Sequence, residues 1–319
     1  MHLVIVGPGI MPIPPKGWGA VESLIWDYKT FLEKYHPDIR VTIVNEQALS
    51  TIVHAVNKAA PDIVHIQYDN HAHIVSGIHC KHVLLTSHYG YLHEERMHSD
   101  AYFGRIVPMF VKNRAIIAAL SPEIANIYRQ FKVPDSRRVV LPNGANEDIF
   151  RYTETPAHPD RTLYLGKVEG RKRQAVYQHI PNLWFAGNCI DNRFNTASPR
   201  YLGEWMKPTL YDQLTDYANL ALISDGEAHA LVCCEALICG LGLVISEYAT
   251  ANLDLSKPFI TVIPKDKMDD VDYVADAIAK NRDISVRMRP EIRAYGLANF
   301  SWRVATDRYA TFLRSLATA

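Results

Sequence analysis

The chain has 319 residues, a length that suggests two domains. Hydrophobic residues make up 48% of it and charged residues 21%, as in ordinary soluble proteins, and the formal net charge is +0 at pH 7. This balance gives no electrostatic reason to expect a nucleic acid as partner. No apolar run reaches the roughly 18 residues of a transmembrane helix, so any contact with a membrane would be peripheral.

The five cysteines indicate a reducing compartment. Their number is odd, and Cys233, Cys234 and Cys239 lie in one apolar stretch. That pattern is typical of buried thiols and not of a disulfide framework. Residues 1–7 are too short a run and too strand-like for a signal peptide. We therefore expect a cytoplasmic protein.

Strand-like runs alternate with helical patterns along the whole chain, which predicts an α/β fold with parallel sheets. In the first half, strands are expected at 2–6, 41–44, 62–68, 82–87, 115–119 and 139–141, and helices at 21–32, 50–60, 102–111 and 122–131. In the second half, strands are expected at 163–165, 183–186, 218–223, 241–246 and 259–263, and helices at 173–179, 208–217, 271–280, 284–299 and 302–316. The polar stretch 151–161 between the halves is expected to be a linker.

The segment 224–240 carries two carboxylates, Glu227 and Glu235, separated by seven residues. It lies between two strand-like runs and is expected to contain a helix of about three turns from His229. In such a unit, ligands collect where the loop meets the helix N-terminus. Backbone N–H groups near 228–231 could hold a phosphate, and the carboxylates could accept hydrogen bonds from hydroxyls. A sugar nucleotide fits this pattern, whereas the simpler alternative is that Glu235 faces solvent.

A group of cations follows an earlier strand in the same half. Gly166 and Lys167 come directly after the strand, and Lys172 lies in the run 171–173. Both lysines could reach a diphosphate as charge-assisted donors. A run of this kind is usually a solvated helix start. However, cations at a helix N-terminus oppose the helix dipole, and a bound anion would explain them.

Three features of the first half are candidates for ligand contact. The loop 17–20 opens a helix with small residues, which suits either an anion or an ordinary turn. His88 follows a strand at its carboxyl end, where either a ligand or a simple rim histidine is expected. Residues 7–12 half-match the dinucleotide fingerprint, but Pro12 replaces its third glycine. A nicotinamide enzyme is therefore a distant alternative.

No metal site is expected. His71 and His73 share one face if they lie on a strand, but metal ligation needs further converging ligands. Asp270 and Asp272 fall in the acidic start of a late helix, where carboxylates act as caps.

Together these motifs resemble glycosyltransferase family 4, a group of retaining GT-B sugar transferases, over nearly the whole chain. Each motif is weak alone, but their order and spacing match those of the family. The matching motifs are the glycine loop Pro14–Glu22, Thr86-Ser87-His88, Ser121, Pro142-Asn143-Gly144 with Phe150, Gly166-Lys167 with Lys172, Glu227-x7-Glu235-Ala236 with Gly240, and Phe300-Ser301-Trp302.

The resemblance implies an α/β GT-B fold with two Rossmann-like domains, whose parallel sheets face a central cleft. Residues 1–150 would form the acceptor-side domain and residues 151–300 the domain that binds the donor. Residues 301–319 would form a helix that crosses back to the first domain.

The resemblance also implies a reaction. A hexosyltransferase-type enzyme (EC 2.4) would move a sugar, with retention, from a nucleotide-diphosphate-sugar to a hydroxyl of a glycan, lipid or small-molecule acceptor. The donor base (UDP, GDP or another) stays open, and neither a metal nor a cofactor is expected. The implied catalytic residues are His88, Glu227 and Lys172. The implied donor site consists of Gly19, Ala20, Gly166, Lys167, Lys172, Glu227, Ala228, His229, Ala230, Leu231 and Glu235.

Within that resemblance, each residue has an expected role. Lys167 and Lys172 would hold the diphosphate, Glu227 the hydroxyls of the transferred sugar, Glu235 the ribose, and Gly19 and Ala20 would bring backbone amides to the phosphate. His88 would lie near the sugar.

The sequence also departs from the family pattern. Lys167 stands where the family has arginine, Ala20 where it has glycine, Asn146 where it has aspartate, and His229-Ala230 where it usually has Phe-Gly. These departures keep two alternatives open. One is a GT-B epimerase or hydrolase that acts on the sugar nucleotide itself, and the other is a catalytically silent subunit that only binds it.

Overall fold

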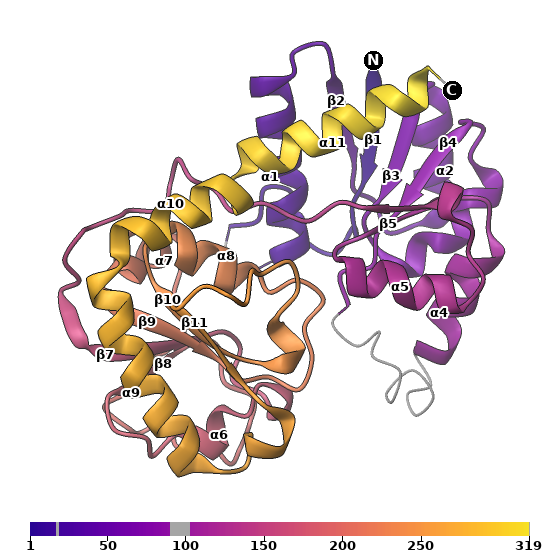
Figure 1. Ribbon diagram of the computed structural model, residues 1–319. Helices are drawn as coiled ribbons and strands as arrows, with labels where there is room; N and C mark the ends of the chain where they lie inside the picture. Colours follow the sequence, from indigo (N-terminus) through magenta and orange to yellow (C-terminus); the bar gives the residue numbers. More distant parts are fainter. Residues whose placement is uncertain (17–18, 90–102, 319) are drawn as a thin grey trace. The chain divides into compact units, whose positions relative to one another are not determined.

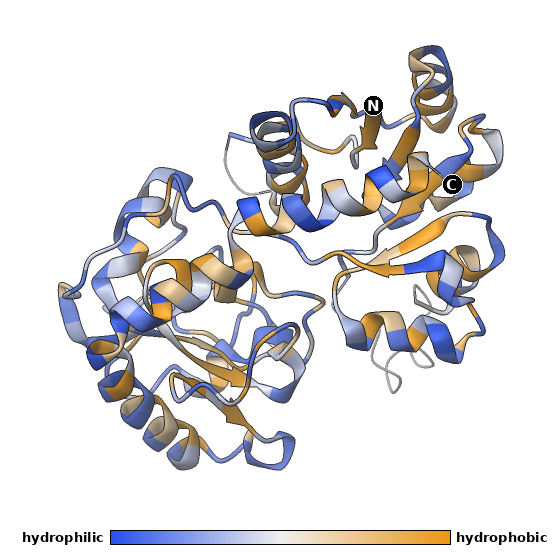
Figure 2. Ribbon diagram, turned by 45° about the horizontal axis from the view of Figure 1, so that its top comes forward, coloured by the Kyte–Doolittle hydropathy of each residue, from blue (hydrophilic) through white to orange (hydrophobic). Residues whose placement is uncertain are grey.

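The computed structural model describes residues 1–16, 19–89 and 103–318 and contains two compact units. Unit 1 consists of Met1–Gly144 and Trp302–Ala319, and unit 2 consists of Ala145–Ser301. Each unit holds one parallel sheet with helices (Figure 1). Figure 2 shows apolar residues along the strands and polar residues on the outer faces of the helices, as two separate α/β cores require. The predicted α/β class is confirmed.

Unit 1 is built on a six-stranded parallel sheet with the order β2-β1-β3-β4-β5-β6. Its central strands are continuous apolar runs, as expected for a parallel sheet covered on both faces. In β1, for example, the four residues 3–6 are fully buried. The strands are β1 (His2–Val6), β2 (Arg40–Val44), β3 (Ile63–Ile66), β4 (His82–Leu85), β5 (Ile116–Ala119) and β6 (Arg138–Val140).

The helices of unit 1 agree with the predicted ones to within a few residues. Ser121 caps α5, because its side chain accepts a hydrogen bond from the backbone N–H of Ile124. Residue 102 of the predicted helix 102–111 lies outside the described residues. The helices are α1 (Ala20–Tyr35), α2 (Leu49–Ala59), α4 (Phe103–Lys112), α5 (Pro122–Gln130) and α11 (Trp302–Ala317), with the 3₁₀-helices η1 (Asp69–Gly77) and η2 (Asp135–Arg137).

The last helix, α11, is part of the core of unit 1. The ring of Tyr28 on α1 lies 4.6 Å from that of Trp302 and 5.2 Å from that of Tyr309, between ring centroids. Gly144 leaves room for this packing, since a Cβ atom there would lie 2.8 Å from Cδ2 of Trp302. The core of unit 1 therefore contains residues that lie before and after unit 2 in the sequence.

The turn after β1 accounts for the glycines of the half-matched dinucleotide fingerprint. Gly9 has a φ of +72°, and a Cβ atom there would lie 2.3 Å from the carbonyl oxygen of Glu46. Its backbone N–H donates to Oδ1 of Asn45 at 2.8 Å. Close packing of this turn against residues 45–47 requires a glycine without any ligand.

Unit 2 is built on a five-stranded parallel sheet with the order β11-β10-β9-β7-β8. Its strands are β7 (His158–Leu165), β8 (Leu183–Ala186), β9 (Tyr217–Leu222), β10 (Gly242–Ser246) and β11 (Ile260–Ile263). Its α-helices are α6 (Gln174–Tyr177), α7 (Lys207–Gln213), α8 (Leu231–Ile238), α9 (Val271–Arg287) and α10 (Arg289–Phe300). Its 3₁₀-helices are η3 (Gly170–Lys172), η4 (Leu214–Asp216), η5 (Glu247–Ala249) and η6 (Lys265–Lys267).

The helix α9 runs through the expected break at 281–283. Asn281 lies in that expected break, but both Asn281 and Ser285 are fully buried against the sheet. Oδ1 of Asn281 accepts a hydrogen bond from Asn219 at 2.9 Å, and the hydroxyl of Ser285 donates to a strand carbonyl, that of Ala218. These bonds to the sheet explain two polar residues in the middle of a helix.

The strand β7 also differs from its prediction, because it begins at His158, inside the stretch expected as a linker. The pairing of β7 with β9 is irregular between His158 and Thr162. Pro159 and the charged residues after it therefore fit at the irregular start of the strand, although they read as a linker.

Candidate functional site

The candidate site lies in unit 2, where the turn after β7 meets the loop after β9. Both segments leave the carboxyl ends of parallel strands, the edge at which ligands bind in open α/β sheets. The turn spans residues 166–173, and the loop spans residues 224–230. The backbone N–H of Asp225 donates to the carbonyl oxygen of Arg171 at 2.9 Å, so that the two segments are tied directly together.

Two glycines allow the turn to form. Gly166 has a φ of +146° and Gly187 a φ of +141°, both in the region that favours glycine. A Cβ atom on Gly187 would lie 2.1 Å from the carbonyl oxygen of Gly166. A Cβ atom on Gly166 would lie 3.4 Å from Nζ of Lys172. The lysine side chain therefore passes directly over the backbone of Gly166.

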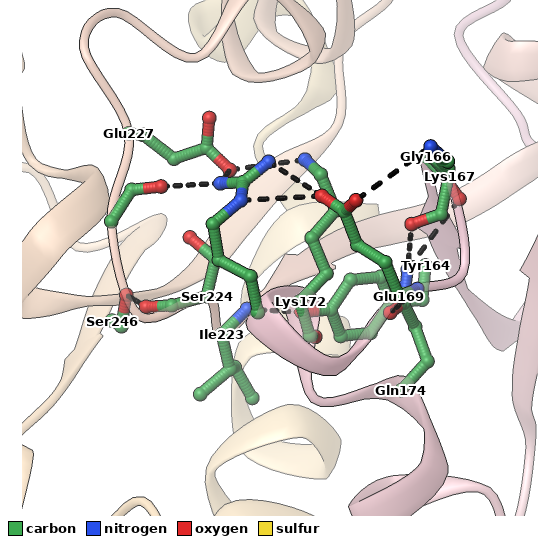
Figure 3. A network of polar contacts seen from close by, with 12 residues as sticks. Tyr164, Gly166, Lys167, Glu169, Lys172, Gln174, Ile223, Ser224, Glu227 and Ser246 are labelled. Atoms are coloured by element: carbon green, nitrogen blue, oxygen red, sulfur yellow. Dashed lines mark hydrogen bonds and ion pairs between the residues drawn. The ribbon is translucent and has the colours of Figure 1, made fainter. Parts of the chain in front are cut away.

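The centre of the site is one carboxylate oxygen that receives two cations (Figure 3). Nζ of Lys172 and Nη1 of Arg171 each lie 3.0 Å from Oε1 of Glu227. Arg171 also donates to Glu169 at 2.8 Å and to the carbonyl oxygen of Gly226. These side chains are partly shielded from water, with 12% of Lys172 and 14% of Glu227 exposed. Their attraction is therefore screened less than that of a surface ion pair.

Glu227 is an ionised acceptor in this arrangement. Burial pushes the pKa of its carboxyl upward, but Lys172 and Arg171 outweigh that effect and lower the pKa below its usual value. Oε2 of Glu227 makes no hydrogen bond to any residue that the structure describes. The carboxylate is thus held through one oxygen and offers the other.

Tyr164 and Gln174 hold the backbone of the site in place, and no motif in the sequence indicated either residue. The hydroxyl of Tyr164 donates to the carbonyl oxygen of Lys172 at 2.5 Å and accepts from the backbone N–H of Ile223 at 2.8 Å. The amide of Gln174 donates to the carbonyl oxygen of Lys167 at 2.9 Å. In the sequence, an apolar strand holding a tyrosine looks like any core strand.

Lys167 is less involved than expected. Its Nζ lies 4.0 Å from Oε2 of Glu169, the limit of an ion pair, and 51% of its side chain is exposed. Of the two lysines after β7, only Lys172 contacts Glu227. The structure thus brings Gly166, Lys172 and Glu227 together and leaves Lys167 at their margin.

The helix after the loop is shorter than expected. α8 begins at Leu231, so Ala228, His229 and Ala230 belong to the loop. Its length is 8 residues, about two turns and not three. The reason is the side chain of His229, which points into the core of unit 2: 7% of it is exposed, and Nε2 lies 3.4 Å from Sγ of Cys234. Burial lowers its pKa to about 4, so the ring is neutral at pH 7.

Glu235 lies on α8, and its side chain is partly buried. It makes no hydrogen bond to Glu227 or Lys172. Burial raises the pKa of the neighbouring thiols Cys233 and Cys234 well above the usual range, so that these thiols stay protonated. The second carboxylate of the Glu-x7-Glu pattern is therefore not bonded to the first carboxylate or to the lysine that contacts it.

In unit 1, His88 lies just beyond β4 at the carboxyl edge of the sheet. Its Nε2 lies 2.7 Å from Oε1 of Gln67. Gly19 has a φ of +130° and directly precedes α1, which begins at Ala20. Gly17 and Trp18 of the predicted loop 17–20 lie outside the described residues.

A buried chain of hydrogen bonds lies behind His88. The hydroxyl of Thr86 donates to the carbonyl oxygen of Ala118 at 3.0 Å, so it accepts from Nε2 of His65 at 2.7 Å. Nδ1 of His65 is then an acceptor, and the hydroxyl of Tyr309 donates to it at 2.6 Å. Burial lowers the pKa of His65 to about 3, with a smaller contribution from His88. His65 is therefore neutral at pH 7.

Asp69, which the sequence analysis did not single out, lies at the start of η1 beyond β3. Burial raises its pKa to about 6, although Ser87 donates a hydrogen bond to it. Its Oδ1 is buried and has no hydrogen-bond partner among the described residues. A signal existed in the strand itself, since an aspartate shortly after a buried strand is often functional.

Among the described residues there is neither a metal-binding cluster nor a membrane-spanning helix. Within 1–16, 19–89 and 103–318, no group of three or more His, Cys, Asp or Glu side chains is arranged to hold a metal ion. In the same ranges, none of the helices combines the length and the apolar character needed to cross a membrane.

Comparison with known proteins identifies the fold. No protein-family model and no curated protein matches the sequence. Several solved structures match the whole chain at low identity. A glycosyltransferase involved in avilamycin A biosynthesis has a TM-score of 0.69 at 15% identity, and the match covers 100% of this chain and 98% of that one.

Two further structures are similar to the same extent. HepE of Anabaena in complex with UDP-glucose has a TM-score of 0.71 at 15% identity, covering 99% of this chain and 100% of that one. The apo form of the lipopolysaccharide outer core galactosyltransferase WaaB has a TM-score of 0.69 at 14% identity, covering 99% of each chain. This chain therefore has the GT-B fold of two Rossmann-like domains, as its sequence predicted.

Proposed function

We propose that the chain is a retaining glycosyltransferase of the hexosyltransferase type, a member of family 4, that acts without a metal ion. It moves a sugar from a nucleotide-diphosphate-sugar to a hydroxyl of a glycan, lipid or small molecule. The observation that carries the proposal is the contact of Lys172 and Arg171 with Glu227 at the carboxyl edge of the sheet of unit 2. Cations for a diphosphate and a carboxylate for sugar hydroxyls lie there side by side.

The solved structures support the class of donor. One of them, HepE, is a complex with UDP-glucose, and others are described as glycosyltransferases. A UDP-sugar is accordingly the first donor to test here. The acceptor has no such support from the fold, because folds of this kind serve many acceptors.

In the proposed donor site, Lys172 binds the diphosphate with the ammonium N–H groups that Glu227 leaves over, and Lys167 reaches the same diphosphate from the margin. Gly166 and the loop 228–231 contribute backbone to this site. Oε2 of Glu227 accepts hydrogen bonds from the transferred sugar, and Glu235 those from the ribose. The side chain of His229 takes no part, because it is buried in the core.

The proposed reaction places its developing charge next to these cations. The bond between the anomeric carbon and the diphosphate oxygen breaks, and its electron pair stays on the diphosphate. The acceptor hydroxyl attacks from the same face, and its proton passes to the leaving diphosphate. Fixed positive charge beside the departing oxygen lowers the barrier. Lys172, with Lys167, supplies the charge that a divalent cation supplies in other transferases.

The residues of unit 1 complete the proposal. His88, held by Gln67 at 2.7 Å, is assigned to the sugar, and Gly19 and Ala20 at the start of α1 to the phosphate. The domain division follows the same logic: residues 1–150 serve the acceptor, 151–300 the donor, and 301–319 return to the first domain. We place the enzyme in the cytoplasm.

The first experiment is a thermal-shift screen with UDP, GDP, ADP and dTDP sugars, without added metal and then with EDTA. A ligand at 100 times its Kd stabilises the folded state by about 2.7 kcal/mol, a shift that is easily measured. Stabilisation by one class of donor that persists in EDTA is expected. If none of these donors stabilises the protein, the proposed function is wrong.

The second experiment follows the donor through the reaction. Incubation of the donor alone, read by NMR, should leave it unchanged, and addition of the correct acceptor should give a product with the anomeric configuration of the donor. Conversion of the donor alone would instead indicate an epimerase or hydrolase. Binding by calorimetry without turnover across an acceptor library would indicate a silent binding subunit.

A further inference from the structure

Two neighbouring cations, Arg171 and Lys172, contact the same carboxylate oxygen, yet their surroundings differ. The guanidinium of Arg171 uses Nε and Nη2 for Oε1 of Glu169, at 3.2 and 2.8 Å. Its Nη1 donates to the carbonyl oxygen of Gly226 and to Oε1 of Glu227. Four of the five N–H bonds of an arginine are thus directed at protein acceptors.

Lys172 is used far less by the protein. Its ammonium group donates to Oε1 of Glu227 at 3.0 Å and to no other residue that the structure describes. An ammonium group has three N–H donors, so two remain for a ligand. The backbone of Lys172 is nevertheless fixed, because its carbonyl oxygen accepts a hydrogen bond from the buried hydroxyl of Tyr164 at 2.5 Å.

Arg171 also holds the loop that carries Glu227. Its carbonyl oxygen accepts from the backbone N–H of Asp225 at 2.9 Å, while its guanidinium binds Gly226 and Glu227. One residue of the turn after β7 therefore contacts three consecutive residues of the loop after β9. Figure 3 shows one oxygen of Glu227 turned toward Lys172 and the other turned away from it.

We propose that Arg171 is a positioning residue, which fixes Glu227 and the loop 225–227 so that Oε2 of Glu227 points to the transferred sugar, while Lys172 is the one of the two cations on Glu227 that binds the diphosphate. The proposal rests on the proposed function and deepens it, because it divides the two cations between sugar recognition and phosphate recognition. Arg171 acts only through Glu227 and touches neither the sugar nor the phosphate.

Calorimetry with two probes, UDP and UDP-glucose, tests this division, with GDP and GDP-mannose as the second pair. Arg171→Gln should lower the affinity for UDP-glucose about tenfold, which is the cost of losing a hydrogen bond to a charged group. It should change the affinity for UDP by less than about twofold. Lys172→Gln should weaken both probes. Arg193→Gln is the matched control, because Arg193 forms a bidentate pair with Asp191 in the same unit and 63% of its side chain is exposed.

A double-mutant cycle shows whether Arg171 acts through Glu227. In the Glu227→Gln background, Arg171→Gln should change UDP-glucose affinity by less than about twofold, because the residue that it positions no longer offers a charged acceptor. Carbon-13 NMR of the Glu227 carboxyl supplies a readout without any ligand. The pKa of that carboxyl should rise in Arg171→Gln and stay unchanged in Arg193→Gln.

The outcomes separate the inference from the proposed function. Equal weakening of UDP and UDP-glucose by Arg171→Gln would make Arg171 a phosphate ligand and overturn the inference, as would full additivity in the cycle. Binding of neither nucleotide pair by the unmodified protein would overturn the proposed function, even if the NMR result showed Arg171 holding Glu227. If Arg171→Gln fails to fold, Arg171→Lys takes its place, because it keeps the positive charge but lacks the several N–H donors of the guanidinium.

Discussion

The carboxyl edges of the two sheets carry polar groups of opposite character. In unit 2 that edge holds ionised groups, with Lys172 and Arg171 both in contact with one oxygen of the Glu227 carboxylate. In unit 1 burial disfavours charge at the corresponding edge: it keeps His65 uncharged and raises the pKa of Asp69 to about 6. Both edges come from the same kind of parallel sheet.

The difference follows from how each edge offsets the free-energy cost of burying polar groups. In unit 2 opposite charges compensate one another and stay ionised, which suits a charged ligand such as a diphosphate. In unit 1 hydrogen bonds satisfy the neutral ring of His65, and burial makes ionisation of Asp69 costly, which suits uncharged hydroxyls. The contrast agrees with the proposed division into a donor domain and an acceptor domain.

The largest expected effect is at the charged edge. Lys172→Ala and Glu227→Ala should each lower kcat/KM for transfer by about a hundredfold, or about 2.7 kcal/mol of barrier, because each removes a contact to the reacting donor. Lys257→Ala, which loses an exposed pair with Asp254 and a contact with the ring of Tyr295, is the control. Steady-state kinetics with the donor from the screen measure the effect. Unchanged kcat/KM in both site variants would remove the charged edge from the mechanism.

The next effect is at the carboxyl edge of the sheet of unit 1, where a substitution is expected to be a gain and not a loss. Asp69→Asn should raise the free energy of unfolding at pH 7 by about 2 kcal/mol, because the wild type must ionise a buried carboxyl whose pKa is raised to about 6. Chemical denaturation at several pH values checks it. The advantage of the variant should shrink as pH falls through 6 toward 3.8, where the wild-type carboxyl becomes protonated in both states.

A gain in stability at pH 7 that does not shrink at low pH would exclude ionisation of Asp69 as its cause. If Asp69→Asn also lowers kcat/KM for transfer, the buried carboxylate contributes to the activity. Asp62→Asn gives a comparison at a second aspartate of the same unit, because its Oδ2 accepts from the backbone N–H of His2 near the surface.

The third effect concerns acid stability. Burial lowers the pKa of His65 from 6.5 to about 3, so below pH 6.5 the unfolded chain takes up a proton that the folded chain cannot. The stability that neutral His65 allows is therefore fully present above pH 6.5 and is lost by about 1.4 kcal/mol for each pH unit below it. His65→Gln should flatten this decline. The test uses the Asp69→Asn background, because Asp69 titrates in the opposite sense.

The window separates His65 from Glu227. Because the pKa of Glu227 is lowered from 4.5, its contribution to the free energy of unfolding is present above pH 4.5 and is lost only below that pH. A decline between pH 6.5 and 5 that His65→Gln does not change would therefore assign the acid sensitivity to another group, such as His229 with its pKa of about 4.

The smallest effect tests the hydrogen bonds behind His88. Tyr309→Phe removes the shorter of two hydrogen bonds to Nδ1 of His65 and leaves that buried acceptor with only the longer one, from Nε2 of Gln67 at 3.3 Å, which should cost about 1 kcal/mol of unfolding free energy. Tyr273→Phe, at a residue with 41% exposure, is the control. Thermal unfolding measures both variants. Equal stability of the two would show that the bond to His65 contributes nothing.

Much of the architecture was predictable from local pattern. The fully buried runs, such as residues 3–6, predicted parallel strands, and their alternation with helices predicted the α/β class. Element boundaries were less predictable where polar residues serve tertiary contacts. Asn281 on α9 suggested a break and Pro159 at the start of β7 suggested a linker, because their partners on the sheet are far away in the sequence.

The sequence by itself determined the fold class, the glycines that the tight turns require and the positions of Lys172 and Glu227 after two strands. Only the tertiary structure decided that Arg171 shares Glu227 with Lys172, that Lys167 stays at the margin, and that His229 turns into the core. The physical reason is that periodicity and turn chemistry act between neighbours in the chain. The partner of a charged side chain, in contrast, depends on which loops the folded sheet brings together, here across more than fifty residues between Arg171 and Glu227.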